Sequence, residues 1–252
     1  MTKSEDAEIV RKFRDVCNEL DELKLKDFHF KVSNCFDHDL RRSLPGWDIS
    51  VSYRVYEEGI SEQKGPLQVP RCMSCDLDCP LELGVKGDGD LDAGGPTARD
   101  SLIFQGEHAR AWLDAKGRPM LIVTPVRHHE RLAALCDAEL LALWRTAMQQ
   151  LARLGLRHFN AMAINHGRNR NHEHLHLKVK LRAWEFDRAV QRADPDVRRR
   201  LDTIRAFAAR RLGRRAEDNF YEPPRHGRGP AAAADNRPPQ QPPDDPSSPA
   251  AR

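Results

Sequence analysis

The stretch His172-Glu173-His174-Leu175-His176-Leu177-Lys178 places three histidines at alternate positions of the chain. Alternate side chains of a β-strand share one face, so a strand here would project all three imidazoles the same way, with Leu175 and Leu177 on the opposite face. Imidazole titrates near neutral pH, acts as a nucleophile or as an acid–base group, and binds metals. The alternation therefore predicts a strand that carries a site.

A second cluster of chemically active side chains lies upstream, at Cys72-Met73-Ser74-Cys75-Asp76-Leu77-Asp78-Cys79. Two thiolates separated by two residues reach one metal from a tight turn, and zinc is the metal that such soft ligands favour. Two thiolates are half of a tetrahedral site, so the residues alone leave open both a zinc site and free thiols without metal.

Composition limits the classes of protein to consider. The 252 residues include 41 Lys and Arg against 38 Asp and Glu, a formal net charge of +3 that does not by itself indicate a nucleic-acid partner. No apolar run reaches the roughly 20 residues that span a bilayer, and the polar, acidic start at Met1–Asp6 is not typical of a signal peptide. We expect a cytoplasmic or nuclear protein without a membrane partner, in which cysteines are thiols or metal ligands rather than disulfides.

Apolar periodicity predicts helices and strands in mixed order. Helices are expected over 5–24 and from Asp137 to a C-cap at Gly155, and strands are expected at 28–32, 49–56, 102–113 with a turn at Gly106, 120–125 and 160–165. The segment 1–68 is interpreted as an N-terminal extension of the main sheet or a small subdomain.

The C-terminal part of the chain has two sections. Residues 185–222 are predicted to be helical and basic, with a helix starting at Asp194-Pro195-Asp196. Its arginines form either a solvated face or a surface for phosphates: Arg198, Arg199, Arg200, Arg205, Arg210 and Arg211. Residues 223–252 are rich in Pro, Ala, Gln, Asp and Ser, a composition that predicts a disordered tail.

Together, these motifs resemble the histidine triad (HIT) family of nucleotide hydrolases and transferases, whose signature is His-φ-His-φ-His-φ-φ with φ apolar. The resemblance covers roughly residues 70–182. It includes a Pro-x-x-His sequence at 125–128 and an Asn165 that is followed by Gly167. It implies an α+β fold, a HIT-like domain over 69–184 with an antiparallel β-sheet and packing helices.

The resemblance also implies roles for individual residues. In the family, the middle histidine attacks the α-phosphate of a nucleotide and carries the nucleotidyl group; the matching residue is His174, with His172, His176 and His128 as the other catalytic residues. Substrate binding is implied for Asn165 and Gly167, and Arg168 and Arg170 are candidate donors to the phosphoryl oxygens because the reaction develops negative charge there. A structural zinc ion is implied at Cys72, Cys75, His128 and His172, with Cys79 as a substitute ligand, and no catalytic cofactor is expected. The implied partners are a nucleotide or nucleotide conjugate and a second copy of the chain in a homodimer.

Three departures from the family pattern keep other functions open. Glu173 occupies an apolar position of the signature, Arg118-Pro119 replaces a common Gly-His, and Asn169-Arg170-Asn171 offers no hydroxyl to protonate a leaving group. The alternatives are a catalytically weak nucleotide-binding protein, a zinc-stabilised regulatory module, and action on adenylylated nucleic-acid ends, as in aprataxin-like members of the family.

Overall fold

The structure is a computed structural model that describes residues 3–25, 27–34, 47–53, 71–81, 83, 95–156, 158–167, 170, 172–192 and 194–213. The chain divides into two units, Met1–Tyr221 and Glu222–Arg252. Every described residue lies in the first unit. The predicted disordered tail and Arg168 lie outside the described residues.

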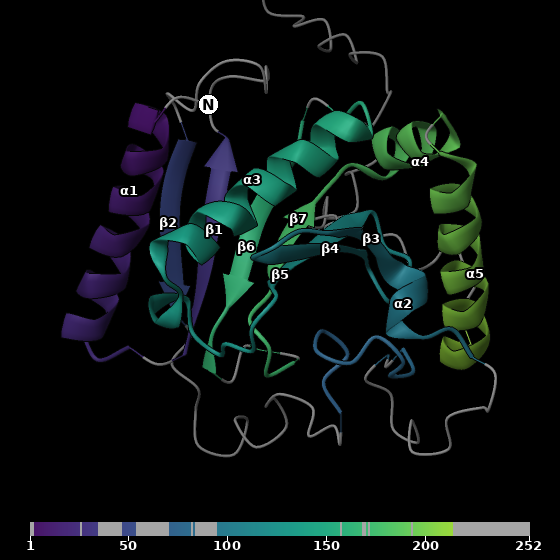
Figure 1. Ribbon diagram of the computed structural model, residues 1–252, viewed down its shortest axis with the longest axis horizontal. Coiled ribbons are helices and arrows are strands. Elements are labelled where there is room, and N and C mark those ends of the chain that lie inside the picture. The colour runs from purple at the N-terminus through teal and green to yellow at the C-terminus, as the bar shows by residue number, and fades with distance from the viewer. Residues whose placement is uncertain are drawn as a thin grey trace, which may run out of the picture. The chain divides into compact units, whose positions relative to one another are not determined.

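Within the described part of the chain, one antiparallel sheet of seven strands organises the fold, in the order β2-β1-β6-β7-β5-β4-β3 (Figure 1). The strands are β1 (Phe28–Asn34), β2 (Trp47–Tyr53), β3 (Leu102–Gln105), β4 (Ala109–Leu113), β5 (Met120–Pro125), β6 (Ala161–Asn165) and β7 (Leu177–Lys180). The N-terminal strands β1 and β2 belong to this same sheet, because β1 pairs with β6.

Five α-helices accompany the described sheet: α1 (Lys3–Glu22), α2 (Ala98–Ser101), α3 (Asp137–Arg153), α4 (Ala183–Arg192) and α5 (Pro195–Leu212). Helix α5 begins as its sequence predicts, with the Asp194 carboxylate accepting a hydrogen bond from the Asp196 N–H and Pro195 in the first turn. No helix in the described part of the chain is both long enough and apolar enough to cross a membrane.

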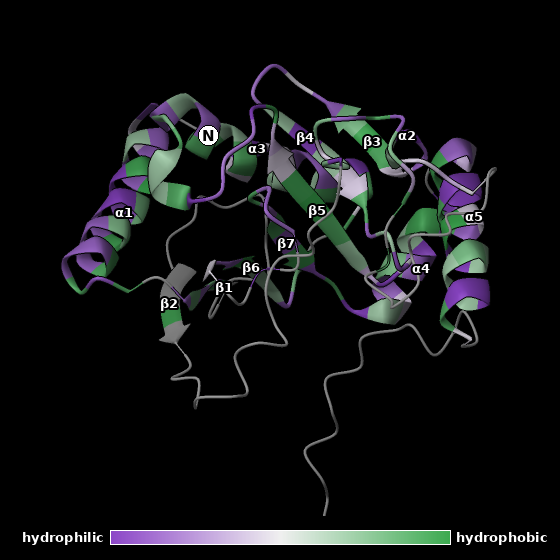
Figure 2. Ribbon diagram, turned by 90° about the horizontal axis from the view of Figure 1, so that it is seen from below, coloured by the Kyte–Doolittle hydropathy of each residue, from purple (hydrophilic) through white to green (hydrophobic). Residues whose placement is uncertain are grey.

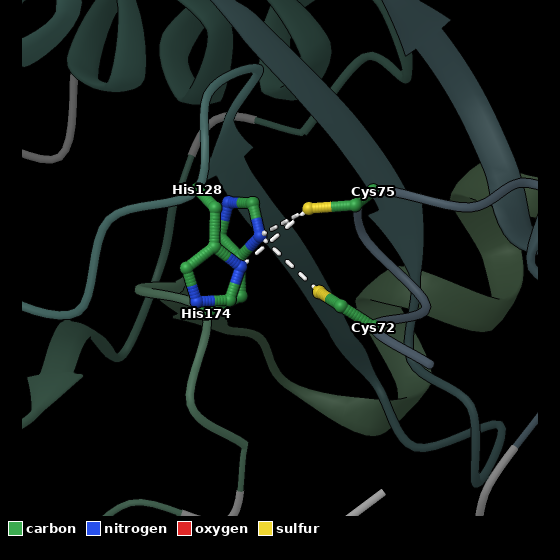
Figure 3. A group of neighbouring side chains, drawn as sticks. All are labelled: Cys72, Cys75, His128 and His174. Atoms are coloured by element: carbon green, nitrogen blue, oxygen red, sulfur yellow. Dashed lines mark hydrogen bonds between the residues drawn. The ribbon is translucent and has the colours of Figure 1, made fainter. Parts of the chain in front are cut away.

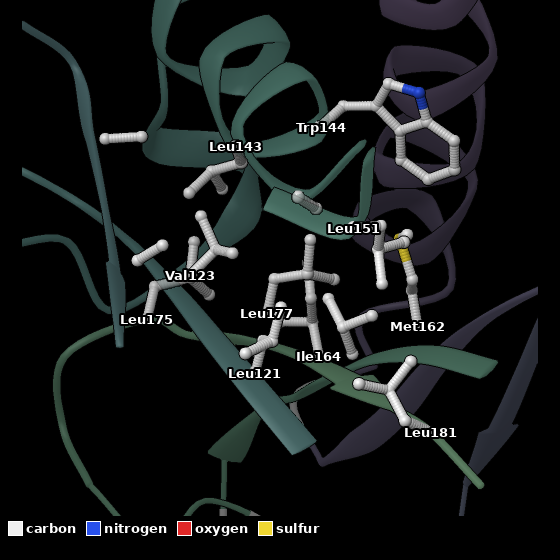
Figure 4. Packing of buried hydrophobic residues seen from close by; sticks show 14 of the residues in the cluster. Leu121, Val123, Leu143, Trp144, Leu151, Met162, Ile164, Leu175, Leu177 and Leu181 are labelled. Carbon is white, nitrogen blue, oxygen red and sulfur yellow. The ribbon is translucent and has the colours of Figure 1, made fainter. Parts of the chain in front are cut away.

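The main core lies between the sheet and the helices α1 and α3. Phe13 of α1 stacks on Phe30 of β1 with ring centroids 5.3 Å apart and meets Trp144 of α3 edge-on at 6.2 Å. Leucine, valine and methionine side chains of β5, β6 and β7 complete this cluster (Figure 4). Strand β5 is hydrophobic over most of its length, whereas α1 alternates between polar and apolar residues (Figure 2). Burying each such side chain contributes about 1.5–3 kcal/mol.

The expected α+β fold with an antiparallel sheet is confirmed. Periodicity correctly located α1 and the strands β1, β3, β4, β5 and β6. One prediction is wrong: the strand expected to start at His172 starts at Leu177, after the three histidines. In that segment the Leu175 N–H donates to the His129 carbonyl at 2.6 Å, a long-range contact, and the Arg170 side chain donates to the Glu173 carbonyl at 3.0 Å, a local one.

Candidate functional site

The Cys72–Cys75 segment folds into the tight turn that its spacing predicts. The N–H groups of Cys75 and Asp76 both donate to the Cys72 carbonyl, at 3.0 and 2.9 Å. Arg110 of β4 donates to the Ser74 carbonyl at 2.6 Å, which ties the turn to the sheet. The two thiols therefore face the same region from a fixed backbone.

Two histidines complete a four-residue cluster around these thiols (Figure 3). His174 Nδ1 lies 3.4 Å from the sulfur of Cys72 and 3.4 Å from that of Cys75, and His128 Nδ1 lies 3.5 Å from the Cys75 sulfur. The four ligand atoms all lie within 4.8 Å of one another. The segment after β5 supplies His128, and the segment before β7 supplies His174.

This cluster fits a structural zinc ion. Zinc–sulfur bonds of about 2.3 Å and zinc–nitrogen bonds of about 2.0–2.1 Å in a tetrahedron place sulfur and nitrogen roughly 3.6 Å apart, close to the observed 3.4–3.5 Å. Burial and the neighbouring Cys72 thiol raise the pKa of Cys75 to about 11. A bound cation favours the thiolate form, so the pair is suited to a metal ion.

Hydrogen bonding determines which nitrogen of His174 faces the thiols. His174 Nε2 lies 3.0 Å from the Pro125 carbonyl, and because a carbonyl only accepts, Nε2 carries the proton and donates. Nδ1 then holds the lone pair, and this is the nitrogen that faces Cys72 and Cys75. Both nitrogens of His174 are thus engaged, one with the backbone and one with the cluster.

The fourth member of the cluster differs from the ligand implied by the family resemblance. Cys72, Cys75 and His128 come together as expected, but His174 stands where His172 was expected. The cause is the late start of β7, which leaves His172 beside His176, with ring centroids 6.0 Å apart. The substitute ligand, Cys79, is buried outside the cluster, with its thiol 3.6 Å from the Arg71 carbonyl.

His176 has the opposite arrangement to His174. Its Nδ1 lies 2.9 Å from the His174 carbonyl, so Nδ1 carries the proton and donates. The lone pair is then on Nε2, for which the described residues provide no hydrogen-bond partner. Burial lowers the pKa of His176 well below its usual value, with Lys178 as the next cause. In the histidine row, which consists of His172, His174 and His176, the residue His176 therefore has a fixed Nδ1 and an available Nε2.

The residues implied in substrate binding have separate positions. Asn165, at the end of β6, lies with its side-chain oxygen 2.5 Å from Nδ1 of His29 on β1. Gly167 has a φ of 57°, a conformation that glycine adopts without strain. Arg170 is held by Glu130, at 3.1 Å, and by backbone carbonyls, so it braces the loop. Glu173 is exposed, away from the core.

The buried carboxylate of Glu139, which lies outside the histidine row, holds the loop that carries His128 in place. Glu139 of α3 is 2% exposed; it accepts from Arg127 Nε at 2.7 Å and from the Cys136 N–H at 3.0 Å, and it lies 3.1 Å from His129 Nε2. Hydrogen bonding from Arg127 is the main cause that holds the pKa of Glu139 far below its usual value. Because Arg127 and His129 flank His128, this carboxylate positions a cluster histidine.

We expect Glu139→Gln to lower the free energy of unfolding by about 2 kcal/mol at pH 7, because it weakens charge-assisted hydrogen bonds in a buried place. The folded-state pKa of Glu139 lies below its unfolded value, so its contribution is present above roughly pH 4.3 and is lost as the pH falls further. Denaturant unfolding at pH 7 and below pH 4 measures both effects. Glu130→Gln, at an exposed ion pair, should change stability by less than about 0.5 kcal/mol. An equal effect of the two variants would contradict this role for Glu139.

Comparison with known proteins finds distant likenesses among solved structures. Similar structures include a uridylyltransferase mutant (15% identity, 84% of this chain and 73% of that chain, TM-score 0.46) and a uridylyltransferase (15% identity, 83% and 69%, TM-score 0.46). A zinc-bound histidine triad family protein from Mycobacterium smegmatis is similar at 25% identity over 44% of this chain and 86% of that chain, with a TM-score of 0.28. No protein-family model and no curated protein matches the chain.

Three residues near the row were not expected to take part in the site. His29 and Lys31 of β1, and Lys178 of β7, lie on the face of the sheet opposite the core, because their strand neighbours Phe30, Val32, Leu177 and Val179 are buried. The alternation in 28–32 indicated which side chains share a face. The pairing of β1 with β6, which brings them beside the histidines, depends on contacts far apart in the sequence.

Proposed function

We propose that this protein hydrolyses or transfers the nucleotidyl group of a nucleotide conjugate, and that His176 carries that group as a nucleotidyl-histidine. The orientation of His176 is the observation that supports this proposal. A histidine nucleophile needs its Nδ1–H held by an acceptor so that the Nε2 lone pair is free to attack. His176 meets this requirement through the His174 carbonyl at 2.9 Å. His174, the residue implied by the resemblance, instead directs its lone pair at the thiols.

The proposed reaction has two balanced steps. The Nε2 lone pair of His176 attacks the α-phosphorus, a P–N bond forms, and the bond from phosphorus to the leaving oxygen or nitrogen breaks. Water then attacks the same phosphorus, the P–N bond breaks with its electron pair returning to Nε2, and one proton of the water passes to solvent. A nucleoside monophosphate is released and His176 is neutral again. Negative charge on the phosphoryl oxygens needs nearby donors. His172, whose ring lies 6.0 Å from that of His176, is the neighbouring candidate.

The Cys2His2 cluster has a structural part in this scheme. A zinc ion bound there, by Cys72, Cys75, His128 and His174, would cross-link the turn before β3, the end of β5 and the approach to β7. That cross-link fixes the His174 carbonyl, which in turn orients His176. The residues of the chain hold the substrate and the proton, and the reaction requires no metal-bound group.

The basic helix gives little support to the nucleic-acid alternative. Arg200 of α5 donates to the carbonyls of Arg99 and Leu102 at 3.1 and 2.9 Å, and Arg205 pairs with Asp187 at 2.6 Å. Arg199 pairs with Asp196 at 2.5 Å. These three guanidinium groups pack α5 against α2 and α4 and stabilise its first turn, so half of the six arginines of the basic run have partners within the protein.

The proposal is tested by trapping the intermediate. The wild-type protein and His176→Ala are incubated with an adenosine phosphoramidate, a dinucleoside polyphosphate or a nucleoside diphosphate sugar, and intact mass is measured after an acid-free quench. We expect a gain of one nucleotidyl mass in the wild type alone, together with release of nucleoside monophosphate. Binding of these compounds without adduct or product would overturn the proposal and favour the nucleotide-binding alternative.

A further inference from the structure

The face of the sheet that carries His176 also gathers lysines. Lys178 and Lys180 alternate with the buried residues Leu177 and Val179, so they continue the direction of His176 along β7. Two strands away, Lys31 of β1 faces the same side. The cations therefore lie beside the proposed nucleophile rather than on a remote surface.

Strand register brings Lys31 and Lys178 into one row. Lys31 pairs with Ala163 of β6, and Ala163 pairs with Lys178 of β7. The two lysine Cα atoms are therefore separated by two strand spacings, about 10 Å. A methyl group is all that β6 places between them, and the same holds at Ala161, which pairs with Lys180. Two long cationic side chains thus flank a strip of small residues.

No carboxylate of the described residues is free to balance the charge of Lys178. Asp114 is the carboxylate that acts on Lys178, but it is bound to Arg118 at 2.7 Å and accepts further hydrogen bonds from backbone N–H groups. Lys178 makes no hydrogen bond or ion pair with the described residues. Burial, followed by the positive charge of Arg118, lowers the pKa of Lys178 to about 8.

A half-buried lysine among other cations lowers the stability of the folded protein unless an anion binds there. Such a local conflict is typical of a functional site rather than of a packing site. His29 experiences the same charges, since Lys180, Lys178 and Lys31 each lower its pKa, after burial as the main cause. The lysines thus surround one place on the sheet, beside His29 and His176.

We propose that Lys178 and Lys31 form a subsite for a phosphate on the leaving group, so that the substrate is a conjugate whose cleaved bond is a phosphoanhydride. This inference rests on the proposed function for the reaction, but the anion subsite itself stands on the lysines. Attack by His176 on the α-phosphorus expels the adjoining phosphate, which takes the electron pair of the broken P–O bond. Lys178, two residues along the strand from His176, stabilises that negative charge.

The sequence before the histidine row agrees with this choice of leaving group. Asn169-Arg170-Asn171 provides no hydroxyl to protonate a leaving group. An amine or an alkoxide needs that proton, whereas a phosphate monoester, with a second pKa of about 6, leaves as a stable anion at neutral pH. The lack of a hydroxyl at these three positions therefore favours a phosphate over an amine as the leaving group.

Binding of inorganic tripolyphosphate tests the subsite without any reaction. Titration calorimetry is performed on the wild-type protein, Lys178→Met, Lys31→Met and a matched control, Lys12→Met, which removes a lysine of α1 that pairs with Glu8. We expect the two site variants to bind tripolyphosphate at least about tenfold more weakly, and the control to be unchanged. Lys178→Met should melt at the same temperature as the wild type or higher, because it removes charge repulsion; a lysine with a structural role would lower it.

Kinetics then separate this inference from the proposed function. In the wild type, kcat/KM for a dinucleoside polyphosphate or a nucleoside diphosphate sugar should exceed that for a phosphoramidate, and Lys178→Met should reduce only the phosphoanhydride reactions. The faster of the two phosphoanhydride compounds identifies the source of the phosphate. Unchanged tripolyphosphate binding in Lys178→Met, or a preference for the phosphoramidate in the wild type, overturns the inference. Lysine-dependent binding with no turnover of any compound leaves the subsite standing and overturns the proposed function.

Discussion

Replacement of His176 by alanine is expected to lower kcat by at least about a thousandfold and to leave zinc content unchanged. Loss of the attacking group removes the covalent step itself, and losses of this size follow when a nucleophile is deleted. Nδ1 of His176 donates to the backbone carbonyl of His174, and His176 is not one of the four cluster residues, so its removal leaves the four cluster side chains in place. Steady-state hydrolysis and metal analysis of the purified variant measure the two quantities.

Two other histidine variants make this prediction specific. His108→Ala removes a half-exposed histidine between β3 and β4 that pairs with Glu107, and it should leave kcat within about twofold of the wild type. His174→Ala should lose zinc and stability as well as activity, because it removes a cluster residue. The assignment of His176 would be contradicted if His176→Ala kept a wild-type kcat, or if it lost metal as His174→Ala does.

Removal of the metal is the change expected to have the largest effect on stability. We expect one zinc ion per chain, and a chelator or Cys75→Ser should lower the free energy of unfolding by about 3 kcal/mol or more, the contribution of an ion held at 100 times its Kd. The cluster joins segments around residues 72, 128 and 174, so its loss frees three loops together. Thermal unfolding with and without chelator, alongside metal analysis, measures the effect.

Cys136→Ser is the matched control for this experiment. Cys136 is an exposed thiol at the N-cap of α3, and serine retains a capping group, so this variant should keep its zinc and its melting temperature. Zinc binding should also weaken at acid pH, because the thiols must lose protons to bind. A wild-type protein that binds no zinc, or whose stability is insensitive to the chelator, would contradict the structural role of the cluster.

Local sequence patterns predict most of the fold. Apolar residues at helical spacing locate α1, alternation locates β1, and a short apolar run between Gly117 and Pro125 locates β5, because these patterns depend only on neighbours in the chain. The start of β7 at Leu177 is different. It accompanies the hydrogen bond from the Leu175 N–H to the His129 carbonyl, which lies in a distant part of the sequence. Periodicity extends a strand back to His172 since it contains no information about such contacts.

In the candidate site, too, local sequence patterns predict some features and long-range contacts decide the others. The Cys-x-x-Cys spacing indicates two of the four cluster residues, and the family resemblance implies a third, His128. The fourth cluster residue is the histidine that reaches the Cys72–Cys75 turn. A displacement of two residues along the sequence makes this residue His174 instead of His172. That displacement also transfers the proposed nucleophile from His174 to His176, because each role is determined by a hydrogen bond to a carbonyl. The lysines were not predicted because their grouping requires the register of β1 on β6.

The most direct test of the central claim is the position of the trapped nucleotidyl group. Wild-type protein is quenched during turnover without acid, digested at neutral pH, and mapped by peptide mass spectrometry across the segment that contains His172, His174 and His176. We expect the nucleotidyl group on His176, with His174 unmodified and zinc retained before digestion. A nucleotidyl group on His174 would contradict the account, because the nitrogen that the structure directs at Cys72 and Cys75 would then be the one that reacts.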